Sequence, residues 1–327
     1  MPYFISRFII FLLIVVFLPA PAFSDQLPFS AWLTDLRREA VQKGISPGIV
    51  GAVLPNNIRP IPRIVELDRK QPEGKITFAE YRKRIVHPLR IRKGREMMRR
   101  YRSELGTVSR TYGVEPQYIV ALWGIETNYG QNTGGFDVVQ ALMTLAYDER
   151  RSAFFRKELF NALQILEEGH IRPDQMTGSW AGAMGQCQFM PSSFLKFAQD
   201  FNGDGKRDIW NTEIDVFASA ANYLSKSGWK GDQRWGREVQ VPRNISENLT
   251  GLDVKKPLSE WRRLGLRRAD GGVLPVVAGM QGSLVMPDGA GGPAYMVYDN
   301  YQVIMDWNRS TYFATSVGLL ANAIAAY

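Results

Sequence analysis

Apolar side chains recur at three- and four-residue steps along most of the chain, which is the pattern of amphipathic helices. The first such run covers 29–55, where Phe29, Trp32, Leu33 and Leu36 share this spacing. The same spacing predicts further helices at 118–125, 154–166, 216–224 and 310–326. Pro116 is suited to the first turn of the helix at 118–125, and Gly130, Gly134 and Gly135 are expected to end that helix.

The pattern changes after Trp235. Short β-like runs follow at 239–241, 272–277, 283–286 and 294–298, with Gly and Pro between them. We therefore expect a small β-rich insertion at 237–297 in a chain that is otherwise mainly α, which makes the fold class mainly α (α+β).

The first residues have the pattern of an export signal. Arg7 precedes an apolar run from Phe8 to Leu18, which is too short to span a bilayer but normal for the core of a signal peptide. Small residues at Ala22 and Ser24 predict cleavage before Asp25. A membrane anchor or a buried first helix are the alternatives. Since no Cys lies near this position, a lipoprotein anchor is excluded, and we expect a periplasmic protein with no later membrane span.

Composition narrows the chemistry. Lys and Arg number 40 against 32 Asp and Glu, and the chain has one Cys and two His. A single Cys excludes an intramolecular disulfide and a Cys-rich zinc site, and two His disfavour a multi-His metal centre. His87 and His170 show no partner pattern and are expected to be structural or exposed, and Cys187 is expected to be a small packed residue. A basic stretch at 82–102 is either an anion-binding face or a solvated helix face, and the second is favoured. No nucleic-acid motif is present.

The most informative carboxylate is Glu126, in the segment Ala121-Leu-Trp-Gly-Ile-Glu-Thr-Asn-Tyr-Gly130. It shares a helix face with Leu122 and Trp123. Apolar neighbours, the negative end of the helix dipole and the absence of a nearby Lys or Arg all raise the pKa of such a carboxyl. A carboxyl that stays protonated near neutral pH suits general acid catalysis of glycoside cleavage. From the local pattern alone, a solvated Glu at a helix end is favoured.

A second segment favours the catalytic interpretation of Glu126. It reads Gly178-Ser-Trp-Ala-Gly-Ala-Met-Gly-Gln-Cys-Gln-Phe-Met-Pro-Ser-Ser193. Its small residues let a polymer approach the backbone, and its amides and hydroxyls are suited to sugar acetamido and hydroxyl groups. Tight helix packing with a turn is the alternative interpretation.

Together with Ala221-Asn-Tyr223, these two segments resemble the lytic murein transglycosylase B family. The resemblance runs in order from about Phe29 to the C-terminus. It implies a lysozyme-like core that cleaves the β-1,4 bond between N-acetylmuramic acid and N-acetylglucosamine in peptidoglycan. The family does so without water and leaves a 1,6-anhydro-muramoyl end. After the export signal at 1–24, we expect an N-terminal helical domain at 25–105, a catalytic core at 106–236, the β-rich domain at 237–297 and a C-terminal segment at 298–327 that returns to the core.

The resemblance also implies roles for single residues. Glu126 matches the family's catalytic acid/base. Ser179 and Gln188 match positions near the acetamido groups, and Arg150 and Arg151 match an arginine pair beside the glycan, facing lactyl or stem-peptide carboxylates. Tyr81, Tyr223 and Asn308 match positions that line the glycan-binding groove. Around Asn308, where the family tends to have Tyr, this chain has Trp307 and Phe313, which keep stacking but lose a hydroxyl.

One carboxylate is enough for this reaction, because the C6 hydroxyl of the muramoyl residue itself attacks C1. Ordinary glycosidases need two, and Asp137, Asp148 and Glu149 remain candidates for a hydrolytic partner. A muramidase that uses water and a non-catalytic wall-binding protein are the alternative functions. The expected partners are peptidoglycan strands, with cell-wall synthesis proteins as further candidates, and we expect a monomer.

A calcium loop is expected at 200–215. The sequence Asp200-Phe-Asn-Gly-Asp-Gly-Lys-Arg-Asp208 fits the first nine positions of an EF-hand loop. Arg207 and Asn211 depart from that pattern, and in the resembled family the last carboxylate comes later, where this chain has Asp215. We expect structural Ca²⁺ at Asp200, Asn202, Asp204, Lys206 and Asp215, and no organic cofactor. An Asp/Gly-rich turn without an ion is the alternative.

Overall fold

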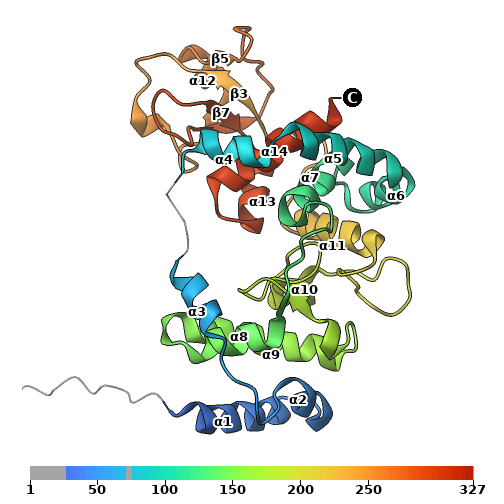
Figure 1. The fold of residues 1–327 in the computed structure, drawn as a ribbon. Helices are drawn as coiled ribbons and strands as arrows, with labels where there is room; N and C mark the ends of the chain where they lie inside the picture. Colours follow the sequence, from blue (N-terminus) through green and yellow to red (C-terminus); the bar gives the residue numbers. More distant parts are fainter. Residues whose placement is uncertain (1–26, 71–75, 327) are drawn as a thin grey trace, which may run out of the picture.

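The computed structural model describes residues 27–70 and 76–326, so the expected signal peptide lies outside the described residues. Helices dominate, as predicted (Figure 1). Among the described helices, none combines the length and the apolar character needed to cross a membrane. The α-helices are α1 (Phe29–Gln42), α2 (Pro47–Val53), α3 (Pro62–Arg69), α4 (Phe78–Ile85), α5 (Pro88–Arg100), α6 (Arg102–Tyr112), α7 (Pro116–Thr127), α8 (Val138–Tyr147), α9 (Ser152–Glu167), α10 (Pro191–Phe197), α11 (Glu213–Lys226), α12 (Leu258–Arg263), α13 (Asp299–Trp307) and α14 (Thr311–Ala325).

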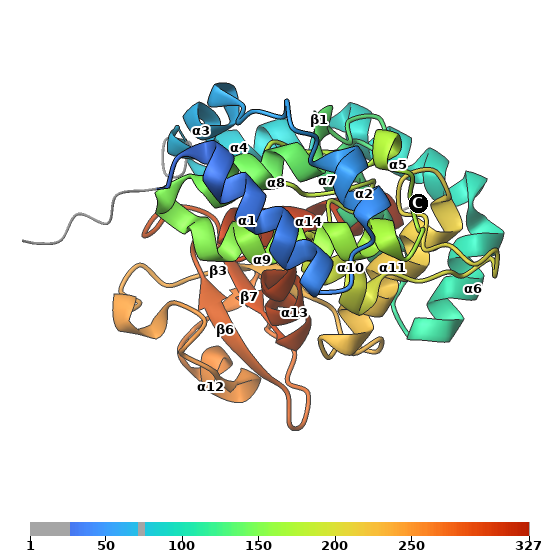
Figure 2. The ribbon, with the colours of Figure 1, turned by 90° about the horizontal axis from the view of Figure 1, so that it is seen from below.

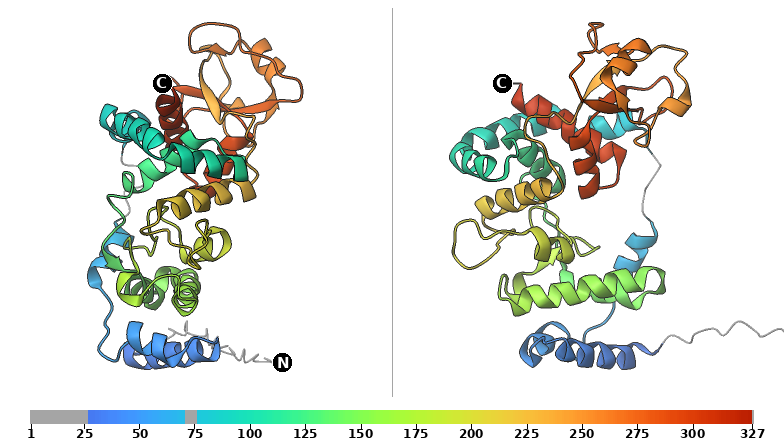
Figure 3. Two further views of the ribbon diagram at one scale, coloured as in Figure 1. Left: turned by 90° about the vertical axis from the view of Figure 1, so that its right-hand side faces the viewer. Right: turned by 180° about the vertical axis from the view of Figure 1, so that it is seen from behind.

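The helices stack in layers, which Figures 1 and 3 show from three sides. Helices α1 and α2 form one end and lie beside the α8–α9 hairpin, which they partly cover when seen from below (Figure 2). Helices α4 and α5 instead contact α14, and α5 also packs on α7. One buried apolar cluster runs through these layers. The domain boundaries given above remain a prediction.

The apolar run at 29–55 forms two helices rather than one. Gly44 adopts a φ of 95°, which ends α1, and Ser46 then begins α2 by accepting a hydrogen bond from the Ile49 amide at 3.4 Å. Pro47 occupies the first position of α2, where its missing N–H costs nothing. The three- and four-residue spacing continues across the break because both helices bury their apolar faces against the same core.

Helix α7 is the central helix of the fold. Pro116 starts it, as the sequence predicts, and every residue from Tyr118 to Gly124 is buried. It ends at Thr127, before the predicted stop at Gly130, because Asn128 and Tyr129 already take left-handed backbone angles with φ of 52° and 62°. Glu126 therefore lies one residue from the end of a rigid, buried helix.

The predicted β-rich segment forms a five-stranded antiparallel sheet with the order β4-β6-β7-β3-β5. Its own small core includes Leu258, Trp261 and Leu284. The expected strand at 272–277 is wrong: only Val273 forms an isolated bridge, and Val276 and Val277 are exposed. The strands are β3 (Gly236–Gln240), β4 (Lys256–Pro257), β5 (Arg267–Arg268), β6 (Gln281–Val285) and β7 (Ala294–Val297), and two-residue strands β1 (Phe136–Asp137) and β2 (Thr177–Gly178) pair elsewhere.

Trp235 joins this sheet to the helical layers. Its fully buried ring lies beside Tyr295 of β7 and Tyr301 of α13, with ring centroids 6.0 Å apart in both cases. On α14, a side-chain carbon at Gly318 would lie 2.2 Å from the indole. Glycine is therefore required there for α14 to approach the sheet. This junction fixes α13, which carries one wall of the site described next.

Candidate functional site

Glu126 is half-buried in an apolar environment built from four parts of the chain. Its own helix contributes Ile119, Leu122 and Trp123, and the others are the 186–187 segment, α11 and α13. The space left between these side chains is about 10 Å³, enough for at most about one water molecule. The side chains that line it besides Glu126 are Ile119, Leu122, Trp123, Gln186, Cys187, Val216, Ala220 and Trp307.

Burial controls the charge state of this carboxyl. It raises the pKa of Glu126 from 4.5 to about 7, while a hydrogen bond from Trp307 acts in the opposite direction. The indole Nε1 of Trp307 donates to Oε1 of Glu126 at 2.8 Å. A pKa near 7 leaves the group able both to give and to take a proton at neutral pH.

Trp307 is held in an aromatic cluster with Tyr223 of α11 and Phe189. The ring of Trp307 lies 4.8 Å from that of Tyr223 and 5.2 Å from that of Phe189. The hydroxyl of Tyr223 donates to the main-chain oxygen of Asp306 at 2.6 Å. Local sequence gives no sign that Trp307 contacts Glu126, because the two are 181 residues apart.

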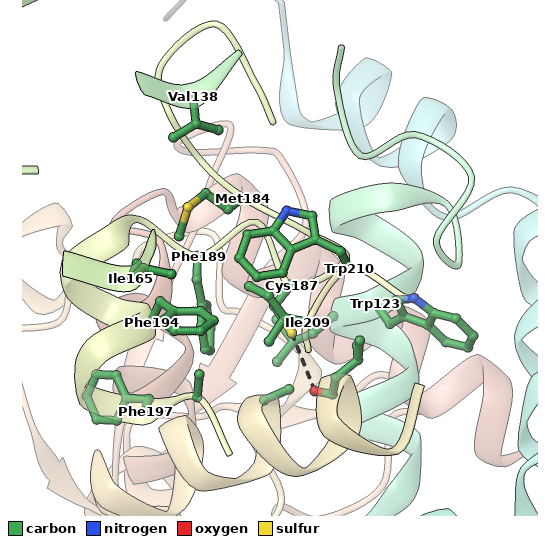
Figure 4. Packing of buried hydrophobic residues seen from close by; sticks show 14 of the residues in the cluster. Trp123, Val138, Ile165, Met184, Cys187, Phe189, Phe194, Phe197, Ile209 and Trp210 are labelled. Atoms are coloured by element: carbon green, nitrogen blue, oxygen red, sulfur yellow. Dashed lines mark hydrogen bonds between the residues drawn. The ribbon is translucent and has the colours of Figure 1, made fainter. Parts of the chain in front are cut away.

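The 178–193 segment is a loop of short bridges up to Met190 and becomes helix only at α10. Gln186 fastens this loop to α7. Its Oε1 accepts from Trp123 Nε1 at 2.7 Å, and its main-chain oxygen accepts from the hydroxyl of Thr127 at 3.0 Å. A side-chain carbon at Gly130 would lie 2.3 Å from the same Oε1. Cys187, which follows, is buried and donates to the Val216 carbonyl at 3.4 Å (Figure 4), and burial raises the pKa of its thiol.

Backbone strain gathers at this junction. Within residues 27–70 and 76–326, the non-glycine residues with positive φ are Asn128, Tyr129 and Gln188. The side-chain Nε2 of Gln188 donates to the carbonyls of Thr133 at 3.1 Å and Gly185 at 2.9 Å. Left-handed angles at such residues cost free energy and are typical of functional sites.

Ser179, Tyr81 and Asn308 lie on three different segments. The hydroxyl of Ser179 accepts from the Ala183 amide at 3.1 Å. Burial raises the pKa of the Tyr81 hydroxyl on α4, and the charge of Glu126 raises it further because the two side chains lie close together. Asn308 directly follows Trp307 and is exposed. Phe313 is only 5% exposed, so it offers little of its ring to a sugar in this structure.

Arg150 and Arg151 bind a carboxylate of the protein itself. Asp68 of α3 is buried, and its two carboxylate oxygens accept from Arg150 Nε at 2.8 Å and from Arg151 at 2.7 Å. Arg150 also lines an open hollow of about 1080 Å³ between α3 and the end of α8. Neither arginine is among the side chains that line the 10 Å³ space beside Glu126, so their place beside the glycan stays a prediction.

The expected calcium loop has oxygen donors that are largely engaged with its own backbone. Asp200 accepts from the amides of Gly203 and Gly205, both at 2.8 Å. Asp215 is fully buried and accepts from the amides of Phe201 at 2.9 Å and Asp208 at 3.0 Å. In the described part of the chain, no three His, Cys, Asp or Glu side chains gather as metal ligands.

The two histidines have structural partners. His87 accepts from the Arg90 amide at 3.3 Å and begins α5, and His170 accepts from the Arg207 amide at 3.3 Å. Most of the basic side chains at 82–102 are exposed, as expected for a solvated face. Arg90 is an exception, because it is half-buried and donates to the Ile85 carbonyl at 2.7 Å.

Comparison with known proteins identifies the family to which this chain belongs. A family model described as "Transglycosylase SLT domain" matches residues 28–322. Membrane-bound lytic murein transglycosylase B of Escherichia coli (strain K12) is 33% identical over 257 residues, covering 78% of this chain and 68% of that protein. SltB3 of Pseudomonas aeruginosa in complex with NAG-anhNAM-pentapeptide is 40% identical, with a TM-score of 0.87 over 91% of this chain and 80% of that one. Escherichia coli lytic transglycosylase Slt35 in complex with calcium is 28% identical, with a TM-score of 0.77 over 90% of this chain and 92% of that one. The lysozyme-like fold and the resemblance to lytic transglycosylases are thereby confirmed, and the chain belongs to the SLT transglycosylase domain family.

Proposed function

We propose that this protein is a peptidoglycan lytic transglycosylase in which Glu126 is the single acid and base. The observation that carries the proposal is a half-buried carboxyl whose pKa is raised to about 7 at the end of a rigid helix. The complex of the relative SltB3 with NAG-anhNAM-pentapeptide supports the substrate class, because an anhydro-muramoyl end is the product of this reaction.

The reaction balances with one carboxyl. Glu126 gives its proton to the glycosidic oxygen, and the bond from that oxygen to C1 of N-acetylmuramic acid breaks. The acetamido group of the same sugar stabilises the positive charge at C1. The Glu126 carboxylate then takes the proton of the C6 hydroxyl, whose oxygen bonds to C1 and closes the 1,6-anhydro ring.

The surroundings of Glu126 support a mechanism without a second carboxylate. The side chains that line its pocket include no other acid. A nucleophile about 5 Å away would raise the pKa of Glu126 through its charge, and among the described residues the causes of the shift are burial and Trp307. Asp137 instead begins α8 by accepting from the Gln140 amide at 2.7 Å, and Asp148 pairs with Arg69 at 3.0 Å.

Substrate contacts follow from the groups that remain available. We assign Ser179, Gln188 and Asn308 to sugar acetamido and hydroxyl groups, and Tyr81 and Tyr223 to the walls of the groove. Arg150 and Arg151 keep about half of their side-chain surface exposed (49% and 41%) while they bind Asp68. The exposed parts of both side chains can therefore bind stem-peptide carboxylates, and Arg150 does so at the rim of the hollow between α3 and α8.

The 200–215 loop is proposed to bind structural calcium. Carboxylate and amide oxygens at Asp200, Asn202 and Asp204 are the donors that Ca²⁺ prefers, and each is exposed. The main-chain oxygen of Lys206 would be a fourth ligand of the calcium ion in this loop. Asp215 is buried and accepts one main-chain amide on each oxygen, and each oxygen has a further lone pair that can face a metal ion. The calcium complex of the relative Slt35 supports the assignment.

Export to the periplasm through the 1–24 signal, action as a monomer and association with cell-wall synthesis proteins are part of the same proposal. The relatedness to a murein transglycosylase supports a place of action at the cell wall.

The test is mass spectrometry of the products released from purified peptidoglycan by the mature protein and by Glu126→Gln. We expect muramoyl products one water lighter than reducing ends from the wild type, and none from the variant. Reducing ends would identify a muramidase. Binding without release by the wild type would identify a wall-binding protein.

A further inference from the structure

We propose that Trp307 is a positioning residue that places the catalytic proton of Glu126 on Oε2. The inference rests on the proposed role of Glu126 and assigns a task to a residue that the sequence indicated only as an aromatic in the groove. Three observations carry it: the direction of the hydrogen bond, the way the indole is held, and the charges around the carboxyl.

The direction of the hydrogen bond is fixed by the indole. An indole nitrogen can donate but cannot accept, so Oε1 of Glu126 is the acceptor in the 2.8 Å contact with Trp307. The form of the carboxyl that suits this contact has a bare Oε1 and its proton on Oε2. No hydrogen bond to Oε2 is found among the described residues. That oxygen therefore has no protein partner to compete for the proton that the glycosidic oxygen would take.

A tyrosine at this position would not select the oxygen in the same way. A phenol can donate or accept, so it is compatible with a proton on either carboxyl oxygen. The resembled family tends to have tyrosine around this position. Because Trp307 can only donate, it leaves no choice about which oxygen of Glu126 carries the proton. The exchange of a hydroxyl for an indole N–H thus has a chemical consequence beyond the loss of one sugar contact.

The indole is held on two sides. Tyr223 and Phe189 contact its ring, at 4.8 Å and 5.2 Å between centroids. Tyr223 also binds the main-chain oxygen of Asp306 at 2.6 Å, which fixes the last turn of α13. A donor fixed in this way loses little freedom when the carboxylate forms.

The hydrogen bond also favours proton release. A bond from N–H to a carboxylate is stronger than one to a neutral carboxyl, so Trp307 stabilises the state reached after the proton has left. The charged or titratable groups that face Glu126 are Tyr81 of α4 and Cys187 of the loop. Burial raises the pKa of both, and no Lys or Arg lines the pocket. Trp307 is therefore the group that offsets part of the burial of Glu126.

Trp307→Phe tests the proposal because it keeps an aromatic ring and removes the N–H. The chain offers a matched control: Trp229 donates its Nε1–H to Glu115, also at 2.8 Å, outside the site. We measure anhydro-muropeptide release at saturating peptidoglycan from pH 5 to 9. We expect Trp307→Phe to release product roughly tenfold to a hundredfold more slowly. We also expect its alkaline limb to lie at higher pH, while Trp229→Phe stays within about twofold of wild type.

A second measurement, by NMR, does not require Trp307→Phe to fold. In ¹⁵N-labelled wild type, one of the 8 tryptophan indole resonances should titrate with a midpoint near the Glu126 pKa of about 7. It should be insensitive to pH in Glu126→Gln. If Glu126→Gln is inactive but no indole shows a titration that this variant removes, or if Trp307→Phe keeps the wild-type rate and pH profile, the positioning role is refuted and the proposed function stands. If Glu126→Gln remains active, both fail.

Discussion

The hydroxyl of Tyr223 donates a 2.6 Å hydrogen bond to the main-chain oxygen of Asp306, one residue before the tryptophan that contacts Glu126. Tyr223 therefore supports the site through the backbone of α13 as well as through its ring. The sequence marked this tyrosine only as a position that lines the groove.

Removing this hydroxyl should loosen the indole without unfolding the protein. For Tyr223→Phe we expect a several-fold slower release of anhydro-muropeptides and a loss of about 1 kcal/mol in the free energy of unfolding, as for one ordinary hydrogen bond. Product assays and denaturant titration measure the two effects. Tyr112→Phe, which loses a 3.2 Å bond to Gln199 away from the site, should lose stability alone. An equal loss of activity in both variants would contradict the role of Tyr223.

The raised pKa of Glu126 has a consequence for stability. The folded chain holds this proton more tightly than the unfolded chain, since the pKa moves from 4.5 to about 7. Ionisation therefore destabilises the fold as the pH rises through this window. We expect Glu126→Gln to be more stable than wild type by about 3 kcal/mol at pH 8, and the two to converge below pH 4.5. Denaturant unfolding across this pH range measures the difference, and a constant difference would refute the shift.

Activity should follow the same titration. The first step needs the protonated acid, so the rate should fall as the pH rises through about 7. Initial rates of product release at constant ionic strength measure this limb. A rate that still rises between pH 7 and 9 would show that the neutral carboxyl is not the reactive form.

The buried carboxylate of Asp68 should be a major contributor to stability. Asp68→Ala leaves two arginines without their shared partner, and we expect a loss of about 2–3 kcal/mol, less than for fully buried cations because both guanidinium groups reach water. Thermal unfolding measures it. The exposed pair of Arg172 and Asp174 at 3.1 Å is the control, and Asp174→Ala should change stability by less than about 0.5 kcal/mol.

Calcium should stabilise only a protein with an intact loop. We expect millimolar Ca²⁺ to raise the unfolding temperature by a few degrees, because binding is restricted to the folded state and such sites are weak. EDTA should reverse the shift, and Asp204→Asn should abolish it, whereas Asp174→Asn should respond as wild type. An equal response of Asp204→Asn and wild type would remove the loop as the site.

The sequence predicted the features that depend on local pattern. Pro116 marks the start of α7, and the apolar run beside Glu126 indicates a carboxyl with a raised pKa. The failures have local causes too. The run at 272–277 contains β-branched residues, but Pro275 interrupts it, and the two valines that follow are exposed. Pattern alone cannot separate an exposed apolar loop from an edge strand.

Contacts between distant segments could not be predicted in this way. Arg150 and Asp68 are 82 residues apart, and nothing near either one identifies the other. The same holds for Trp307 and Glu126. The resemblance supplied the names of most candidate residues, but it described the arginines as ligand-facing, whereas the fold first uses them to neutralise a buried aspartate.

The acid is assembled from segments that leave the ribosome at very different times. Glu126 emerges early, whereas α13, which carries Trp307, is among the last elements to be made. Until α13 docks, the carboxyl lacks its fixed donor and one part of its apolar enclosure. A chain that ends before α13 therefore carries the acid but not the group that orients it.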